Sequence, residues 1–505
     1  MESKREIVFW KKVFWGTCLL SIGIKLLIAM KVPLTGDEAY YIQWSKYPAL
    51  GYFDQPPMIA WILSGMRFFG TSPWILRLPS VFMPSFLAPL LVDLLDRFGR
   101  GKGSVDLSRN SSWTSIAGIL FLIAPIHLFF PILSTDLPLI LFSFLSFYFF
   151  NRSLLEDRDL FAGVAGLFFG LAFLSKYFVL LLGVSFLVYG CIYFKEKKVW
   201  KKLILGILAF LPFLALHLFW NANHCWINFF FNTSVRNIDE KYSLDHFFEF
   251  IKFQLFLLGP VGIYFTVRSL KRVIHVKKTQ MGLLGGLSFL IPVFAFGASS
   301  FHYRQGLHWT LSFYPYFYLV FALLLKHEDL RSALRLSVFW SALCAFCIAI
   351  LISQPVESWR SYYFYRGLKF YLAAPALSRV LESYRGEFEL ASDGYTEAAL
   401  LESYMPGRVH VFGEGVIFGR EDDFLTDWRT LERKNILIFT RHGREKHEFE
   451  PYFESVERIP IELDGHIYHV LLGRHLNFRA YRDRVLAGIA RTYYPQGCSI
   501  MGRYF

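Results

Sequence analysis

The sequence contains few charged residues for its length. Only 18% of its 505 residues are Asp, Glu, Lys or Arg, whereas soluble domains carry about 25%. Hydrophobic residues make up 54% of the chain, Phe alone occurs 55 times, and the mean hydropathy is +0.37. This composition excludes an ordinary soluble protein and predicts one that spans a membrane.

Acidic residues are scarcer than basic ones, 40 against 53, which gives a formal net charge of +13. An excess of this size could indicate nucleic-acid binding, but no basic stripe occurs on a soluble segment. Membrane proteins collect Lys and Arg in their cytoplasmic loops without matching acidic residues. We therefore expect membrane lipids around the protein and no nucleic-acid partner.

Cysteine is also rare, with six residues in the chain. Four of them lie inside apolar runs and are typical of small packing residues: Cys18, Cys191, Cys344 and Cys347. The CxxC spacing of the last two gives no redox motif within a membrane helix. Cys225 and Cys498 fall outside the apolar runs, and the sequence leaves open whether they form a disulfide.

Long apolar runs mark the candidate membrane spans, which need about 20 residues each. Eleven runs occur, at 9–30, 73–95, 113–133, 137–151, 160–175, 178–194, 203–220, 251–269, 281–298, 309–325 and 335–353. The first is too long for a signal peptide and lacks a small-residue cleavage site, so we expect a retained span.

The loops between these runs alternate in basic content. One set carries 23 Lys and Arg residues and the other set carries 7. This asymmetry places the first set in the cytoplasm. The loop at 31–72 therefore faces outward, and an odd number of spans puts the C-terminal region on the same side.

Charges become frequent and apolar runs short after about residue 355, which predicts a second domain. Strands are expected near Phe388–Ala391, Arg408–Phe412, Asn435–Phe439 and Ile467–Leu471, with a helix at about 395–404. We predict a polytopic α-helical membrane module of about eleven transmembrane helices at 1–355. A small extracytoplasmic α/β domain follows at 356–505.

Specific polar groups occur at the outer ends of the spans, where charge is costly to desolvate. Asp37 and Glu38 follow the first span, and Asp136 and Lys176 each lie in a minimal loop between two spans. Asp136 could simply cap a helix, and Lys176 could extend its ammonium to the interface. Two carboxylates in loops on one face nevertheless indicate a catalytic site there.

Further outward segments carry donors and cations suited to a phosphate. These are Asn221, His224, Arg236, His302, Arg304 and His308. Aromatic residues accompany them at Trp220, Trp226 and Trp309, which are also typical of an interfacial belt.

Several of these segments together resemble the GT-C glycosyltransferases that use polyprenyl-phosphate sugars, which include protein mannosyltransferases and the bacterial lipid A aminoarabinose, galacturonosyl and hexosaminyl transferases. The matching motifs are GDEAYY at 36–41, GYFDQPPMIAW at 51–61, TDLPL at 135–139, LSKY at 174–177, FWNANHCW at 219–226, and Gln254 before Gly259-Pro260. They occur in the expected order over about residues 30–315.

The resemblance implies a GT-C fold and an inverting transfer of a sugar from a polyprenyl-phosphate donor at the outer face of the bacterial inner membrane. The residues that it makes catalytic are Asp37 as the base, Glu38, and Asp136, which orients the base or the acceptor. Those that it assigns to the donor phosphate and substrate are Lys176, Tyr177, Arg304, His308, Tyr40, Asp54, Gln55, Asn221 and His224. The expected acceptor is lipid A or lipopolysaccharide core, with another glycan or a protein as alternatives.

Two positions depart from the family pattern. Gln55 stands where relatives often have His, and the aminoarabinose subgroup has Lys there and Arg where Tyr40 stands. Contacts that relatives make through these positions do not carry over. Metal dependence stays open, with Asp54 and His224 as candidate ligands for a divalent metal.

Other functions fit less well. A protein O-glycosyltransferase of the same fold is the nearest alternative. A transporter or lipid flippase would show related halves and charges at mid-membrane, but no repeat is visible and Lys25 is the exception among the spans. A receptor or scaffold would not need Asp37 and Asp136 on one face.

Overall fold

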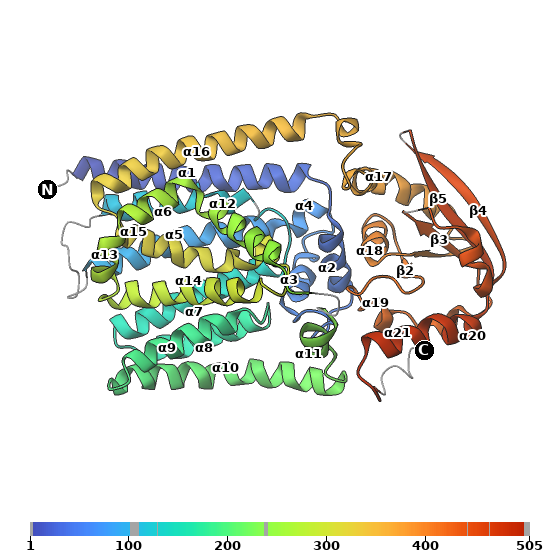
Figure 1. Ribbon diagram of the computed structural model, residues 1–505, viewed down its shortest axis with the longest axis horizontal. Coiled ribbons are helices and arrows are strands. Elements are labelled where there is room, and N and C mark those ends of the chain that lie inside the picture. The colour runs from blue at the N-terminus through green and yellow to red at the C-terminus, as the bar shows by residue number, and fades with distance from the viewer. Residues whose placement is uncertain are drawn as a thin grey trace. The chain divides into compact units, whose positions relative to one another are not determined.

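The computed structural model describes residues 4–100, 111–128, 130–236, 241–441, 443–463 and 465–498. Most of the segment between the predicted spans at 73–95 and 113–133, which belongs to the predicted basic loops, lies outside these residues. The chain divides into two compact units (Figure 1). The first contains Met1–Lys31, Thr71–Ala215 and Asp239–Ser353, and the second contains Val32–Gly70, Leu216–Ile238 and Gln354–Phe505.

The first unit is built from helices whose axes lie roughly along one common line in Figure 1. They are α1 (Lys4–Lys31), α4 (Pro73–Leu76), α5 (Leu78–Arg100), α6 (Ser111–Leu122), α7 (Asp136–Leu155), α8 (Asp159–Phe173), α9 (Val179–Ile192), α10 (Lys197–Asn223), α12 (Leu244–Arg268), α13 (Leu270–Val276), α14 (Gln280–Ser299), α15 (Tyr314–Leu324) and α16 (His327–Ser353). The end of α10, from Leu216 on, belongs to the second unit. By length and composition, seven of the described helices could cross a membrane: α1, α4 with α5, α7, α10, α12, α14 and α16. The chain is therefore a multi-pass membrane protein.

Each predicted span coincides with helical structure, but some helices are shorter than the predicted run. Helices α6, α8 and α9 fall in the range of 10–17 residues. The largest difference is at α6, which ends at Leu122 although the apolar run continues to residue 133. Pro125 lacks an amide hydrogen and disfavours helical geometry in the residue before it, so a 3-10 turn, η1 (Pro125–Leu128), follows instead.

A kink interrupts α12 at Gly259, whose φ of 64° is a conformation that glycine adopts without a steric penalty. Pro260 follows it. Gln254 precedes the kink and is buried, and it donates to Thr310 Oγ1 at 3.3 Å and accepts from the Tyr314 hydroxyl at 3.1 Å. These bonds fix the polar side chain inside the membrane unit.

The described part of the second unit contains a five-stranded sheet in the order β2-β1-β3-β5-β4. The strands are β1 (Glu389–Ser392), β2 (His410–Val411), β3 (Ile436–Thr440), β4 (Phe453–Leu463) and β5 (His466–Leu476). Strand β1 pairs in parallel with β2 and β3, while β5 pairs antiparallel with β3 and β4. Strand β3 is buried along its whole length, as expected for an apolar central strand.

Helices and turns surround this sheet and complete the second unit. They are α2 (Gly36–Lys46), α3 (Met58–Met66), α11 (Ile227–Phe230), η2 (Phe231–Val235), η4 (Val356–Trp359), α17 (Tyr365–Glu382), α18 (Tyr395–Ser403), α19 (Asp422–Leu425), η5 (Trp428–Leu431), η6 (Lys446–Glu448), η7 (Glu450–Tyr452), α20 (Phe478–Tyr481), η8 (Arg482–Leu486) and α21 (Ala487–Tyr493).

The four predicted strands and the predicted helix at 395–404 are present, but sequence reasoning missed β4. This strand lies at the edge of the sheet, most of its residues are partly or fully exposed, and it contains Pro460. Proline is tolerated in strands mainly at edges, so the charged and proline-containing segment resembles a loop in sequence.

One hydrophobic core joins parts of the second unit that are far apart in sequence. Phe53 and Trp220 belong to the same buried cluster as Ile438 of β3 and Leu471 of β5. The segments around Phe53 and Trp220 therefore fold with the sheet. The second unit also contains Val32–Gly70 and Leu216–Ile238, and the division into domains at 1–355 and 356–505 stays a prediction.

Candidate active site

Asp37 and Glu38, the two acidic residues at the start of α2, have different surroundings. Thr35 caps the helix: its Oγ1 accepts a hydrogen bond from the Glu38 amide at 3.4 Å, and Glu38 Oε2 accepts one from the Thr35 amide at 3.0 Å. This reciprocal capping box holds the Glu38 carboxylate inside the fold. Glu38 is fully buried, whereas Asp37 beside it is exposed.

Asp37 is open to solvent while protein groups crowd its carboxylate. This crowding raises the pKa of Asp37, the charge of Glu38 adds to the effect, and a hydrogen bond from the Tyr395 side chain opposes it. A carboxylate with a raised pKa is a stronger base than a free one and can still exchange protons with water or substrate.

Asp54 is a second carboxylate in the same unit. Burial raises its pKa, its own backbone amide and the charge of Arg236 oppose the rise, and the charge of Asp37 adds to it; together they bring the pKa to about 7. Asp54 Oδ1 is buried and has no hydrogen-bond partner among the described residues. The loop therefore holds a carboxyl group that titrates near neutral pH.

Replacing Asp54 by Asn is expected to remove a pH-dependent loss of stability. The unfolded Asp54 ionises near its ordinary pKa of about 3.9, whereas the folded group stays protonated up to about pH 7. Folding therefore takes up a proton in this window, and stability falls as pH rises from about 4 to 7. Apparent melting temperatures of Asp54→Asn should exceed those of wild type by an amount that grows to pH 7 and then levels. A difference in melting temperature between Asp54→Asn and wild type that does not change with pH would contradict the raised pKa of Asp54.

Residues from the C-terminal segment hold these loops. Glu421 is buried: its carboxylate accepts a hydrogen bond from the Phe53 amide at 2.8 Å, and its own amide donates to the Tyr40 hydroxyl at 3.1 Å. Burial raises the pKa of Glu421. Gln43 of α2 donates to Glu402 at 3.2 Å. Tyr40 and Asp54 thus lie in a framework that sequence reasoning did not identify.

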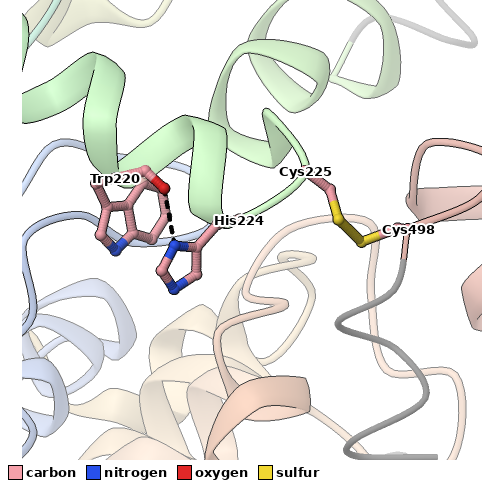
Figure 2. Close-up of a disulfide and its surroundings, with 4 residues drawn as sticks. All are labelled: Trp220, His224, Cys225 and Cys498. Atoms are coloured by element: carbon pink, nitrogen blue, oxygen red, sulfur yellow. Dashed lines mark hydrogen bonds between the residues drawn. A yellow bond between two sulfur atoms is a disulfide. The ribbon is translucent and has the colours of Figure 1, made fainter.

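The last turns of α10 and His224, which follows them, lie against the loop that contains Gly51. The His224 ring stacks on Trp220 with centroids 4.2 Å apart, and its Nδ1 lies 2.8 Å from the Trp220 carbonyl oxygen (Figure 2). Gly51 lies against the same indole, because a Cβ at Gly51 would come within 2.5 Å of it. Asn221 donates to the His217 carbonyl at 3.0 Å. Burial lowers the pKa of His224, so its ring is neutral near pH 7.

A disulfide joins Cys225 to Cys498, which answers the question that the sequence left open (Figure 2). Cys225 and Trp226 both have positive φ, 53° and 57°. The bond therefore fixes the turn that follows His224 to the C-terminal end of the described chain.

Loss of this disulfide should destabilise the second unit by about 2–5 kcal/mol. Cys225→Ser, Cys498→Ser and the double variant should all melt at the same lowered temperature, because any of them removes the one bond. Wild type treated with a reductant should melt at this same lowered temperature. Cys347→Ser, at an exposed free thiol, is the matched control. Additive effects of the two serine substitutions would contradict the bond.

The first unit contains a separate charged cluster. Lys176 Nζ lies 3.0 Å from both carboxylate oxygens of Asp136, and both residues are buried. His308 Nε2 lies 3.7 Å from Asp136 Oδ2, and the His308 side chain is 53% exposed. Lys176 also lies 4.8 Å from the centre of the Phe178 ring. Asp136, Lys176 and His308, predicted separately, are brought together.

The remaining predicted residues lie elsewhere. Arg304 is exposed and pairs with Glu249 of α12 at 3.0 Å. The Tyr177 ring packs near Phe173, with centroids 5.6 Å apart. The Gln55 carbonyl accepts a hydrogen bond from the Tyr52 amide at 3.1 Å, which closes the loop turn. Roles for these three in substrate binding stay predictions.

The donor set does not fit a metal centre. Within the described ranges, no three His, Cys, Asp or Glu residues are grouped to hold a metal ion. His224 also has its Nδ1 occupied by the Trp220 carbonyl. Asp54 and His224 remain candidate ligands from the sequence only.

Comparison with known proteins gives consistent matches to a family, to a relative and to two solved structures. The family of dolichyl-phosphate-mannose-protein mannosyltransferases matches residues 54–220. Lipid A galacturonosyltransferase RgtD of Rhizobium johnstonii is 28% identical over 257 residues, 47% of this chain and 49% of that protein. The chain thus spans about half the length of the curated relative that it matches.

Two crystal structures share the fold. ArnT from Cupriavidus metallidurans bound to undecaprenyl phosphate has a TM-score of 0.63 at 14% identity, and its apo state has 0.64 at 13%. Each comparison covers 92% of this chain and 98% of ArnT. The predicted resemblance and the GT-C fold, with its small C-terminal sheet, are confirmed.

Proposed function

We propose that this chain, which has the GT-C fold, is a glycosyltransferase that moves a sugar from a polyprenyl phosphate to lipid A or lipopolysaccharide core. The observation that carries the proposal is the solvent-open Asp37 with its raised pKa, in the first turn of α2. The name of RgtD supports the acceptor. The undecaprenyl phosphate bound to ArnT supports the donor.

The reaction is one displacement at the anomeric carbon, with inversion. An acceptor hydroxyl forms the new C–O bond, the bond from that carbon to the phosphate oxygen breaks, and polyprenyl phosphate leaves with the electron pair. Asp37 takes the proton of the acceptor hydroxyl. The capping box occupies Glu38, so the base role falls to Asp37 alone.

The departing phosphate needs positive charge. We assign this task to Lys176, which Asp136 holds in place through both carboxylate oxygens. His308, close to the same carboxylate, is the second donor. Asp136 therefore acts through Lys176 as a positioning residue. The apolar helices of the first unit suit a donor whose prenyl tail stays in hydrocarbon.

The reaction takes place on the periplasmic side of the inner membrane. Two observations support this placement. Loops with 7 Lys and Arg residues face outward against 23 on the other side, and the Cys225–Cys498 disulfide belongs to an oxidising compartment. A reporter fused after residue 360 should be active only outside the cytoplasm.

Deletion of the gene in the native host tests the proposal. Mass spectra of lipid A and core oligosaccharide should lose one sugar, and the lipid-linked sugar should accumulate. Galacturonic acid is the first sugar to test, by likeness to RgtD. Unchanged lipid A and core would overturn the acceptor and favour a protein O-glycosyltransferase, the alternative that the match to protein mannosyltransferases supports.

A further inference from the structure

A cavity of about 400 Å³ lies among four helices of the first unit, α7, α8, α9 and α10. These helices are neighbours at one edge of this unit in Figure 1. The lining is almost entirely apolar and includes Phe150 of α7, Phe169 of α8, Val184 of α9 and Ile207 of α10. Val184 and Ile207 are 43% and 46% exposed, so the cavity is a groove that is open on one side. Because α7 and α10 are long enough to span a membrane, the groove opens toward lipid.

The groove is long and has a continuous wall. It follows α10 from Lys202 to Leu214, which at 1.5 Å per residue is about 18 Å. This is more than half of the hydrocarbon thickness of a bilayer, which is about 30 Å. Helices α8 and α10 approach closely along it, since a Cβ at Gly166 would come within 2.0 Å of the Gly206 carbonyl oxygen. A groove of this length and lining fits one extended hydrocarbon chain.

Only one end of the groove carries charge. Among the described residues that line it, Lys202 alone is charged. Lys202 is buried and pairs with Asp157 at 3.2 Å and with Asp159 at 2.5 Å. Lys198 and Lys201 pair with the same two aspartates, at 3.3 Å and 2.5 Å. Three lysines thus share two carboxylates, which leaves an excess of positive charge at this end.

Two further lysines precede this cluster. Lys195 and Lys197 are exposed, and within the part of the chain that the structure describes neither pairs with a carboxylate. The segment 195–202 contains five lysines and one glutamate and belongs to the basic loops that the sequence predicts in the cytoplasm. A lysine cluster at the cytoplasmic end of a membrane helix attracts anionic lipids.

We propose that the groove binds an acyl chain of an anionic phospholipid, whose phosphate lies against the lysines at the start of α10. The apolar wall takes the chain, and the ammonium groups of Lys195 and Lys197 take the negative headgroup. The polyprenyl donor fits less well, because its phosphate is assigned to Lys176, at the opposite end of α9 from this cluster. The inference does not depend on the proposed function, since this lipid stays unreacted.

Native mass spectrometry of the purified full chain tests the headgroup. The probes are phosphatidylglycerol and phosphatidylethanolamine with identical acyl chains. Wild type should bind phosphatidylglycerol roughly tenfold more tightly, because only this lipid has a net negative charge. Lys195→Gln with Lys197→Gln should remove the preference. Lys277→Gln with Lys278→Gln, at two exposed lysines of another basic loop, is the matched control and should keep it. Equal binding of the two lipids by wild type would overturn the proposal.

Filling the groove tests where the acyl chain lies. Ile207→Trp places an indole in the groove and should weaken phosphatidylglycerol binding roughly tenfold or more, because buried methylene groups are displaced. Leu208→Trp is the matched control, since Leu208 is 56% exposed and lies outside the lining. Both variants should melt near wild type.

Two results of this second test would overturn the proposal. One is equal phosphatidylglycerol binding by Ile207→Trp and Leu208→Trp. The other is displacement of phosphatidylglycerol from wild type by polyprenyl phosphate, with the polyprenyl phosphate itself excluded by Ile207→Trp, which would assign the groove to the donor tail. The lysine variants change only exposed side chains, so they decide the headgroup even where Ile207→Trp does not fold.

Discussion

Asp37→Asn is expected to abolish sugar transfer, with a loss of about 10²–10⁴-fold or more in kcat. Asparagine has nearly the shape of aspartate but cannot accept the acceptor proton, so chemistry should fail while packing survives. The measurement is sugar transfer by the purified variant together with its melting temperature. The melting temperature should stay within a few degrees of wild type, because Asp37 is exposed and the capping box uses Glu38.

Asp245→Asn is the matched control, since Asp245 is an exposed acid in the first turn of α12. It should transfer sugar at the wild-type rate. Near-normal turnover by Asp37→Asn would remove Asp37 as the base. A loss of both activity and fold would show that Asp37 is structural.

Breaking the Lys176–Asp136 pair is expected to cost about 3–5 kcal/mol of stability, because either single substitution leaves a buried charge without its main partner. Lys176→Met and Asp136→Leu should each melt well below wild type. The double variant should recover most of the lost stability, since it removes both charges together. Thermal unfolding of the four purified proteins (wild type, both single variants and the double variant) measures these differences in stability.

Activity separates the structural and functional parts of the pair. The stable double variant should still transfer at least about 100-fold more slowly than wild type, because no ammonium then holds the departing phosphate. Arg304→Gln is a control for stability: its exposed pair with Glu249 is worth about 0–1 kcal/mol. A double variant with full activity would contradict the assignment of Lys176 to the phosphate.

Composition and periodicity were sufficient to predict the membrane helices and most of the sheet. Long apolar runs have one structural solution in hydrocarbon, so α1 and α10 follow directly from sequence. The early end of α6 depends on a single proline within an apolar run. The sequence of edge strand β4 does not show the alternation of apolar and polar residues that predicts a strand, because β4 is stabilised by its pairing with β5.

The candidate site could be predicted only where local sequence defines it. Thr35-x-x-Glu38 is a readable capping box, and it could have marked Glu38 as structural from the start. Asp136 begins α7 and Lys176 lies in the short connection between α8 and α9, so both are charged residues next to apolar runs, which the sequence shows directly. Glu421, by contrast, contacts Tyr40 across 381 positions of sequence. The charged run at 420–423 resembles a solvated turn, and only folding shows that it is buried.

The most direct test of the central claim is formation of a new glycosidic bond by the purified full-length protein in detergent. Lipid-linked sugar extracted from the deletion strain serves as donor and lipid A as acceptor, and mass spectrometry follows both products. The account predicts a sugar added to lipid A, with release of polyprenyl phosphate, by wild type but not by Asp37→Asn. A transporter has no membrane to cross in detergent. Unchanged donor and acceptor with wild-type protein would therefore contradict the assignment as a transferase.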